Sequence, residues 1–407
     1  MNVTALNSPG FRLYLFGSFI ALNGLWVQRV IIGWLAWELT GSPAFVGLAA
    51  FLSLAPTIIS GPIFGVIIDR TNIRIAFFLS YSGMIICSIL LFSLIKTELL
   101  TNNSLLVICL FIGFIASAAH PIRMSLAPRL VDDIHLPSMV VLTAVNFNTS
   151  RLIGPAIGGI LIQTFEVSGA ILCSIFSFIP VMLFITIIKP RNIEIDENSK
   201  TLISSFIEGI KVILSSKIIK IAIILSGITS FIGRGILETL PLISEGVFQK
   251  GPSGLGLITA TAGAGALFSS ISKALGKSEV ERKNIPIKSF IIALMIPLIV
   301  LTLGYVNEFK ITLFLIFILG FLVTTIGISI QSKIQLELSD TFRGRVMSVW
   351  VMINMGSAAL GTIIFGFVSD HLTIQMTQVV FGYIFIILIV FLISINKMTS
   401  SFSILSK

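Results

Sequence analysis

Four charged side chains lie within long apolar stretches of this chain: Arg29, Arg151, Arg234 and Glu238. Each stretch is close to the length that crosses a bilayer as a helix, roughly 20 residues. A charged side chain at the centre of a bilayer costs about 3 kcal/mol or more, so such residues usually face a cavity and take part in function. Guanidinium groups pair with carboxylates, phosphates and catecholates in a forked geometry. Three arginines against one glutamate therefore predict a positive cavity that suits an anionic small molecule.

The predicted substrate cavity also includes two polar side chains that are close to these arginines in the sequence. Its residues are Gln28, Arg29, Asn148, Arg151, Arg234 and Glu238. A structural alternative stays open at this point, in which Arg151 only caps carbonyl groups freed by Pro155 or bridges two helices.

Transport driven by protons needs a titratable group that alternates between two environments. Glu238 is the first candidate, because it follows Arg234 by four residues and so lies on the same face of a helix. Arg234 would keep this carboxylate ionised until a ligand competes for the guanidinium. His120 is the second candidate, against the alternative that a lone buried histidine is structural.

The composition excludes an ordinary soluble domain. The chain has 407 residues, of which 55% are hydrophobic and 11% are charged, and its mean hydropathy is +1.05. Soluble domains carry about 25% charged residues, so we expect an all-α integral membrane protein with about twelve spans. The expected spans are residues 12–37, 44–68, 75–95, 104–126, 138–163, 168–188, 217–243, 253–273, 287–306, 310–331, 344–369 and 376–396.

The distribution of basic residues predicts the orientation. Of the 27 lysines and arginines, 21 fall on the side of the two termini, three fall in the opposite loops and three fall within spans. Basic residues accumulate in cytoplasmic loops, so we expect both termini in the cytoplasm and the lipid bilayer as the surrounding partner. These loops also explain the net charge of +9, and nucleic acid is not an expected partner.

Several classes of function lack their residues. The three cysteines and three histidines are scattered, without the spacing of a disulfide framework or a metal site. The sequence has no paired carboxylates, no nucleophile with a base and no phosphate-binding loop. We therefore expect no metal, no cofactor and no enzymatic activity.

A polar stretch near the middle of the chain divides it into two parts. "KPRNIEIDENSK" is followed by "SSFIEGIKVILSSK", whose apolar residues recur at helical spacing between lysines, as in an amphipathic helix on a membrane surface. The predicted units are a six-helix bundle at 1–188, a cytoplasmic linker at 189–216 and a second six-helix bundle at 217–407. A weak repeat of "RLVDDIHLPSMVVLTAVNFN" as "LELSDTFRGRVMSVWVMINM" supports two related halves.

The motif "GPIFGVIIDRTNIRIAF" ends the second expected span. It resembles the loop between helices 2 and 3 of the major facilitator superfamily, which implies a cytoplasmic gate. The gate residues are Gly65, Asp69, Arg70 and Arg74, with Arg123 as a partner for Asp69. The family usually has glycine where Asn72 stands, and Asn tolerates the left-handed backbone that such a turn needs. An ordinary charged loop is the alternative.

The stretch "NFNTSRLIGPAIGGILI" places Arg151 beside residues that weaken a helix. Pro155 removes a backbone hydrogen bond and permits a bend, and Gly154, Gly158 and Gly159 let a neighbouring helix approach closely. "GPAIGG" resembles the helix-5 motif of exporters in the same superfamily. The match is partial, because Val141 and Ser150 stand where that motif expects glycine. A kinked packing face without directional meaning is the alternative.

Three further segments resemble bacterial exporters of the enterobactin-exporter type, also called transmembrane secretion effectors: residues 11–51, "HPIRMSLAPRLV" and "FRGRVMSVW". The resemblance covers nearly the whole chain. It implies twelve transmembrane helices in two pseudo-symmetric six-helix bundles, located as a monomer in the bacterial inner membrane. The implied activity is proton-coupled export of a small, anionic molecule such as a siderophore, by alternating access. The alternatives are a multidrug efflux pump of the same fold and an importer of a siderophore or metabolite.

Overall fold

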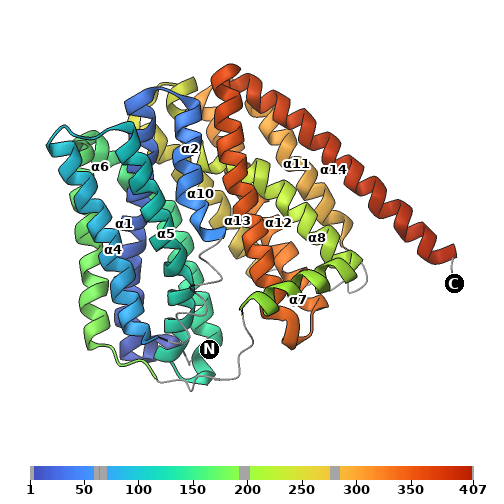
Figure 1. Cartoon of the computed structure of the whole chain (residues 1–407), viewed down its shortest axis with the longest axis horizontal. Coiled ribbons are helices and arrows are strands. Elements are labelled where there is room, and N and C mark those ends of the chain that lie inside the picture. The colour runs from blue at the N-terminus through green and yellow to red at the C-terminus, as the bar shows by residue number, and fades with distance from the viewer. Residues whose placement is uncertain (1–3, 59–63, 65–70, 192–201, 276–284, 406–407) are drawn as a thin grey trace.

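The structure, a computed structural model, describes residues 4–58, 64, 71–191, 202–275 and 285–405 (Figure 1). Within these ranges every regular element is a helix and no strand occurs. This confirms the predicted all-α class. Helices suit a bilayer because they satisfy all backbone hydrogen-bonding groups within one segment.

The helices fall on either side of the mid-chain linker. The first half contains η1 (Ala5–Asn7), α1 (Pro9–Thr40), α2 (Pro43–Leu54), α4 (Ile73–Lys96), α5 (Asn102–Leu126), η2 (Ala127–Leu130), η3 (Asp133–His135) and α6 (Leu136–Ile187). The linker contains α7 (Leu202–Ser215). The second half contains α8 (Lys217–Thr229), η4 (Ser230–Arg234), α9 (Gly235–Glu238), η5 (Leu242–Val247), α10 (Gly251–Leu275), α11 (Ile287–Leu303), α12 (Phe309–Glu337), α13 (Asp340–His371) and α14 (Ile374–Leu405).

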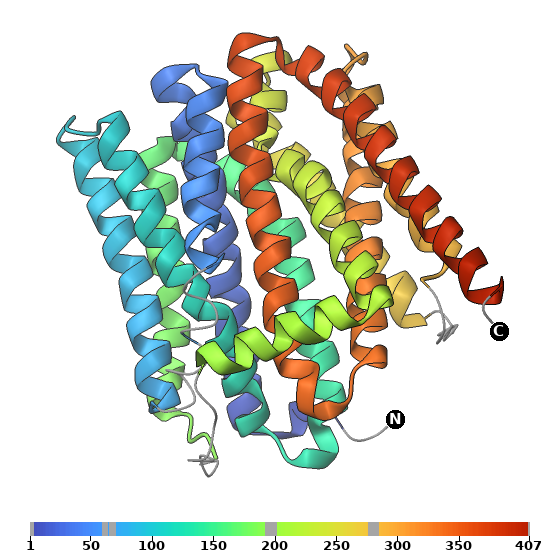
Figure 2. The same cartoon turned by 45° about the vertical axis from the view of Figure 1, so that its right-hand side comes forward.

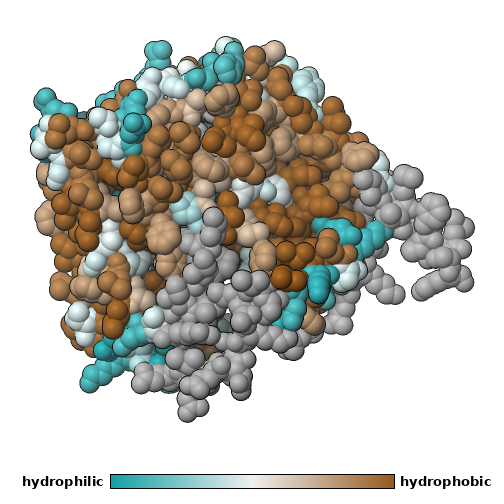
Figure 3. Space-filling view, in the orientation of Figure 1, coloured by the Kyte–Doolittle hydropathy of each residue, from teal (hydrophilic) through white to brown (hydrophobic). Residues whose placement is uncertain are grey.

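Nine of the described helices are long and apolar enough to cross a membrane, and two shorter apolar helices cover Pro43–Ile58 and Ile287–Leu303. α6 covers two expected spans. They meet at a kink at Glu166, where the backbone leaves helical geometry (φ 60°, ψ 176°). Hydrophobic residues cover the middle of the face seen in Figure 3. The protein therefore has the helices of a multi-pass membrane protein. The count of twelve stays a prediction, since part of the second expected span lies outside the described residues.

The two ends of the helix bundle differ in their connections. Both chain termini lie in the lower half of Figure 1, and we call the lower end of the bundle the near end. The opposite end, the far end, has tight turns, and the positive-φ residues of the described chain lie there. These residues are Gly41, Glu98, Glu166, Gln249 and Gly251. A left-handed residue is a common way to end a helix and reverse the chain, so the far end is made of short connections.

Close helix packing joins the two halves at the far end, where α2 lies beside α13 (Figure 1). There α6 also packs against α10. A Cβ atom on Gly47 would lie 3.0 Å from the Cα of Gly366, and one on Gly159 would lie 2.9 Å from the Cα of Gly256. Only glycine fits such contacts between backbones. A hydrogen bond of 3.0 Å from the Ser42 hydroxyl to Asp370 adds to this contact.

The linker forms the predicted helix, α7, which crosses the near end of the molecule in Figure 2. Glu208 of α7 forms an ion pair with Arg345 of α13. Gly209 lies against the backbone of Arg345, so the linker helix docks on the second half. The division at 1–188, 189–216 and 217–407 stays a prediction.

The Gly159 contact predicts a test of the far-end packing. Gly159→Val should destabilise the packing of the two halves at the far end by about 1–3 kcal/mol, because the new side chain meets the backbone of α10. Spin labels at Phe165 and Lys250 should then report longer distances between α6 and α10. Gly327→Val is the matched control, because nothing lies within 4 Å of a Cβ there. Unchanged distances in the Gly159 variant would contradict the prediction.

Candidate functional site

The segment that carries Arg234 and Glu238 is not a regular helix. α8 ends at Thr229, and a π-helical turn, η4, spans Ser230–Arg234 before α9 resumes the α-helix to Glu238. Pro241 then precedes a second π-helical turn, η5. A π-helical turn adds a residue to one turn of a helix and often marks a functional site. The two charged residues therefore sit at the ends of the short elements in an interrupted span.

Glu238 joins two arginines that come from different halves. Its carboxylate oxygens lie 3.4 and 3.5 Å from Nη1 of Arg29 on α1. Nε of Arg234 lies 3.9 Å from Oε1 of Glu238, so the pairing expected from their spacing is present at a longer distance. The exposed fractions are 38% for Arg29, 33% for Arg234 and 22% for Glu238. The three groups therefore border a space between the halves that solvent can reach.

Arg151 lies beside this group without a carboxylate of its own among the described contacts. Its charge interacts with those of Arg234, Glu238 and Arg29. Its guanidinium carbon lies 5.9 Å from the ring centroid of Trp26, and that of Arg29 lies 4.9 Å from the same ring. We call Arg29, Arg151, Arg234, Glu238 and Trp26 the central cluster. Three guanidinium groups and one carboxylate leave it with an excess of two positive charges.

Trp26 is a member of the cluster that the sequence did not reveal. Its indole Nε1 is buried and has no hydrogen-bond acceptor among the described residues. A buried donor without an acceptor is costly, and two cations close to the same ring make an anionic oxygen a suitable partner. A tryptophan in an apolar span is usually explained by helix packing. Its position in the sequence therefore does not show that it lies beside Arg29 and Arg151.

The glycines of the helix-5 motif bring α6 close to helices of both halves. A Cβ on Gly154 would lie 2.6 Å from the Cβ of Trp26, and one on Gly158 would lie 3.2 Å from the Cα of Val27. Gly159 faces α10 instead. The motif therefore packs α6 against α1 and α10 and holds Arg151 near Trp26. Its role in export stays a prediction.

Two predicted cavity residues lie apart from the cluster's ion pairs. Gln28 is 2% exposed, and its side-chain amide donates to the Ser88 hydroxyl of α4 at 2.9 Å. Asn148 donates to the carbonyl of Ala144, one turn earlier in α6, at 2.9 Å. Consecutive helical residues point in directions about 100° apart, which explains why Gln28 faces α4 while Arg29 faces Glu238.

The predicted gate is described only in part, because Gly65, Asp69 and Arg70 lie outside the described residues. Arg74 donates a hydrogen bond to the carbonyl of Ile188, at the end of α6. Arg123 lines a cavity of about 10 Å³ together with Tyr81. His120 occupies a helical position in α5, and its side chain is outside the described part.

The left-handed backbone expected at Asn72 is wrong. Asn72 has φ −62° and ψ 114°, which is an extended conformation. Its side chain accepts a hydrogen bond of 3.0 Å from the backbone N–H of Arg74. Asparagine is among the best N-cap residues because its side chain satisfies a free N–H of the first helical turn. Asn72 therefore begins α4 as a cap.

The sequence did not reveal a further ion pair at Lys333, which follows the expected span 310–331 and was therefore expected in a loop. α12 extends to Glu337, and the Lys333 ammonium lies 2.7 Å from the Glu337 carboxylate. The side chain of Lys333 is 8% exposed. The spacing of four residues was a visible signal, but the expected span ended at residue 331.

Solved structures of membrane transporters show the same fold as these two groups of helices. The nucleoside transporter NupG superimposes with a TM-score of 0.74 at 14% identity, covering 95% of this chain and 98% of that one. The D-xylose-proton symporter gives a TM-score of 0.69 at 14% identity, covering 94% and 95%. The fold is that of the major facilitator superfamily.

The chain belongs to the transmembrane secretion effector family, whose model matches residues 2–403. It is 22% identical to the staphyloferrin A transporter of Staphylococcus aureus over 91% of this chain and 92% of that protein. It is 24% identical to macrolide efflux protein A of Streptococcus pyogenes over 56% of each chain. The protein is therefore a secondary transporter that moves a small molecule across a membrane, and not an enzyme.

The Arg29–Glu238 pair predicts an energetic coupling between the halves. Arg29→Gln and Glu238→Gln should each lower the thermal stability of the purified protein, and the double variant should lose less than their sum. We expect a coupling of about 0.5–3 kcal/mol, as for residues in direct contact. Unfolding of the wild type and the three variants in one detergent measures it. Additive losses would show that the pair does not hold the halves together.

Proposed function

We propose that this protein exports a small anionic molecule, such as a siderophore, by proton-coupled alternating access. The observation that carries the proposal is the excess of two positive charges in the central cluster. Guanidinium groups in a medium of low dielectric bind carboxylates, phosphates or catecholates strongly. A cationic ligand would be repelled by the same charges, which disfavours a pump for cationic drugs.

The geometry of the ion pairs supports a ligand that competes with Glu238. Charge-assisted hydrogen bonds are commonly about 2.7–2.9 Å long, whereas Glu238 lies 3.4 Å from Arg29 and 3.9 Å from Arg234. Both arginines are therefore loosely paired, and an anionic ligand can replace the carboxylate with shorter contacts. The unsatisfied N–H of Trp26 supplies one further donor beside the same guanidinium groups.

The contacts between the two halves support an assignment of this conformation to one state of the transport cycle. The halves are in close contact at the far end, at Gly47–Gly366 and Gly159–Gly256. With both termini in the cytoplasm, as the basic residues predict, the far end is the outer end. The structure then corresponds to the state closed to the outside, in which an exporter receives its ligand from the cytoplasm. Rocking of the halves about the central cluster would release it.

The direction of transport has two supports. Gly159 of the partial export motif lies at the contact between α6 and α10, where the halves must separate for release. Of the two relatives named above, the staphyloferrin A transporter has a name that gives no direction, whereas macrolide efflux protein A is named for efflux. The second of these keeps a multidrug efflux pump as the alternative, beside an importer. We place the protein in the bacterial inner membrane as a functional monomer.

Secretion by iron-starved cells tests the proposed ligand and direction together. Deleting the gene should lower the iron chelator in the spent medium and raise its intracellular pool. Restoring the wild-type gene should reverse both changes. Unchanged secretion would exclude this substrate, and broad drug resistance on overexpression would favour the efflux alternative. A deletion that lowers uptake of the chelator would identify an importer.

The role of the tryptophan is tested by Trp26→Phe, which keeps an aromatic ring and removes the N–H. Losing a hydrogen bond to a charged group costs about 1.5–3 kcal/mol, so KM for the ligand should rise about tenfold or more. Trp34→Phe is the matched control, because Trp34 lies two turns along α1 from Trp26. Equal KM values for the Trp26 variant and the wild type would remove Trp26 from the ligand site.

The coupling role of Glu238 is tested by Glu238→Gln, which keeps the shape of the side chain and removes its titration. We expect transport driven by a proton gradient to fall to the rate without a gradient, while ligand exchange between the two sides continues. Glu38→Gln is the control, since Glu38 lies near the far end of α1. Full gradient-driven transport by the Glu238 variant would assign coupling to another group, and His120 would be the next to test.

A further inference from the structure

A cavity of about 360 Å³ lies at the near end of the first half, away from the central cluster. It is formed where α1 begins, where η2 leads toward α6 and where α6 ends. Its lining residues are Ser8, Pro9, Gly10, Leu13, Arg129, Leu130, Val131, Asp132, Ile187, Ile188, Lys189 and Arg191. The volume is in the range of small-molecule sites, and the proposed transport path does not use it.

The lining is positively charged, with three cations and one carboxylate. Arg191 is already engaged, because it donates to the carbonyl of Val131 and lies 3.1 Å from Asp133. Arg129 donates to the Ser125 hydroxyl at 3.2 Å, and its Nε is buried without an acceptor among the described residues. Lys189 is exposed and has no ion pair with the described residues. Arg129 and Lys189 therefore remain able to bind an anion.

The first turn of α1 adds backbone donors to these two cations. Ser8 is the N-cap residue, but its side chain does not cap the helix. Its hydroxyl donates instead to the carbonyl of Leu130. The free N–H groups and the positive end of the helix dipole favour an anion next to Gly10. The cavity therefore collects side-chain and backbone donors.

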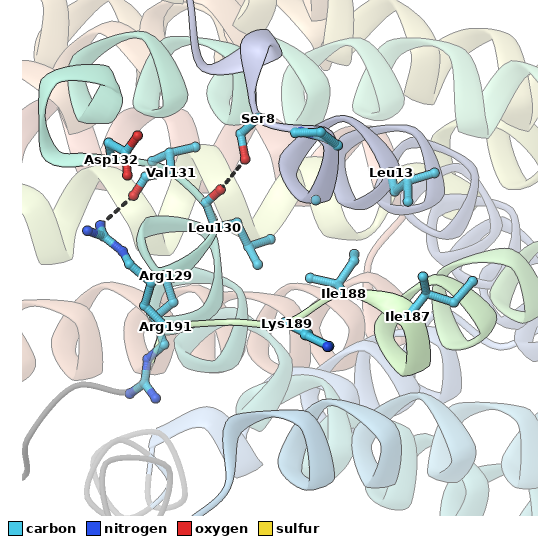
Figure 4. Close-up of a pocket in the computed structure, with 12 residues that line it drawn as sticks. Ser8, Leu13, Arg129, Leu130, Val131, Asp132, Ile187, Ile188, Lys189 and Arg191 are labelled. Carbon is cyan, nitrogen blue, oxygen red and sulfur yellow. Dashed lines mark hydrogen bonds between the residues drawn. The ribbon is translucent and has the colours of Figure 1, made fainter.

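The polar and apolar residues of the cavity are separated. In Figure 4 the side chains of Asp132, Arg129 and Arg191 lie on one side, and those of Leu13 and Ile187 lie on the other. Ile187 is 67% exposed and is the last residue of α6. Arg74 holds the adjoining wall by donating to the carbonyl of Ile188. An occupant must therefore combine an anionic group with an apolar chain.

We propose that this cavity binds an anionic phospholipid, with the phosphate facing Arg129, Lys189 and the first turn of α1 and an acyl chain along Leu13 and Ile187. Basic pockets between the ends of transmembrane helices hold anionic lipid headgroups in this way. A soluble phosphate would use the cations and leave the apolar wall bare, which is why the lipid is the better fit. The proposal is independent of the transported ligand.

Thermal unfolding of the delipidated full-length protein tests this site. Added phosphatidylglycerol should raise Tm by roughly 2–4 °C more than phosphatidylcholine at the same concentration. The double variant Arg129→Gln/Lys189→Gln should lose this difference. If that variant does not fold, Lys189→Glu alone serves, because Lys189 is exposed. The matched control is Lys217→Gln/Lys220→Gln, which removes two exposed cations at the start of α8 and should keep the difference.

Three results would overturn the proposal. The first is an equal response to phosphatidylcholine, which would show that charge is not recognised. The second is an equal rise with inorganic phosphate, which would show that the occupant is a soluble anion. The third is an undiminished phosphatidylglycerol response in the pocket variants, which would place the lipid elsewhere. Ligand transport is not measured in this experiment, so failure of the proposed export function leaves its result unaffected.

Discussion

The carboxylate of Glu238 links the two halves of the molecule at the level of its intramembrane charges. A charged side chain within a membrane-spanning helix needs a partner, because an uncompensated charge at the centre of a bilayer costs about 3 kcal/mol or more. Here the partner Arg29 comes from α1, 209 residues away in the sequence. Arg29 and Glu238 therefore neutralise each other only while the two halves lie together. Any motion that separates α1 from α9 removes this partner from each charge, so water or another ion must replace it.

Backbone packing sets the distance at which that ion pair forms. Gly158 allows α6 to approach α1, and Gly159 allows it to approach α10 of the other half. Arg151 is about two turns before these glycines on the same helix. The combination of an arginine with glycines and a proline in one apolar span thus has a physical reason. The glycines bring three helices close together, and the arginine then reaches the ring of Trp26.

The sequence predicted the features that depend on local pattern. Hydropathy revealed the helices, and the spacing of Arg234 and Glu238 placed both on one face. It could not pair Arg29 with Glu238, because that contact depends on how the two halves pack. The direction of Gln28 depends on the rotation of α1 about its axis, and the π-helical turn that ends at Arg234 has no sequence signature. Asn72 was assigned to a loop turn for its backbone tolerance, whereas its side chain acts as a helix cap.

The fold does not identify the ligand, since a nucleoside transporter and a xylose-proton symporter share it. The charge of the central cluster is more selective. Under the proposed function, a ligand with two negative charges neutralises the cluster, and the loaded site then moves outward with little electrical work. The empty site returns inward with its positive excess, and a negative-inside potential favours that step by about 2.3 kcal/mol per charge that crosses the full field at 100 mV. The arginines that bind the ligand would therefore also help to return the empty transporter.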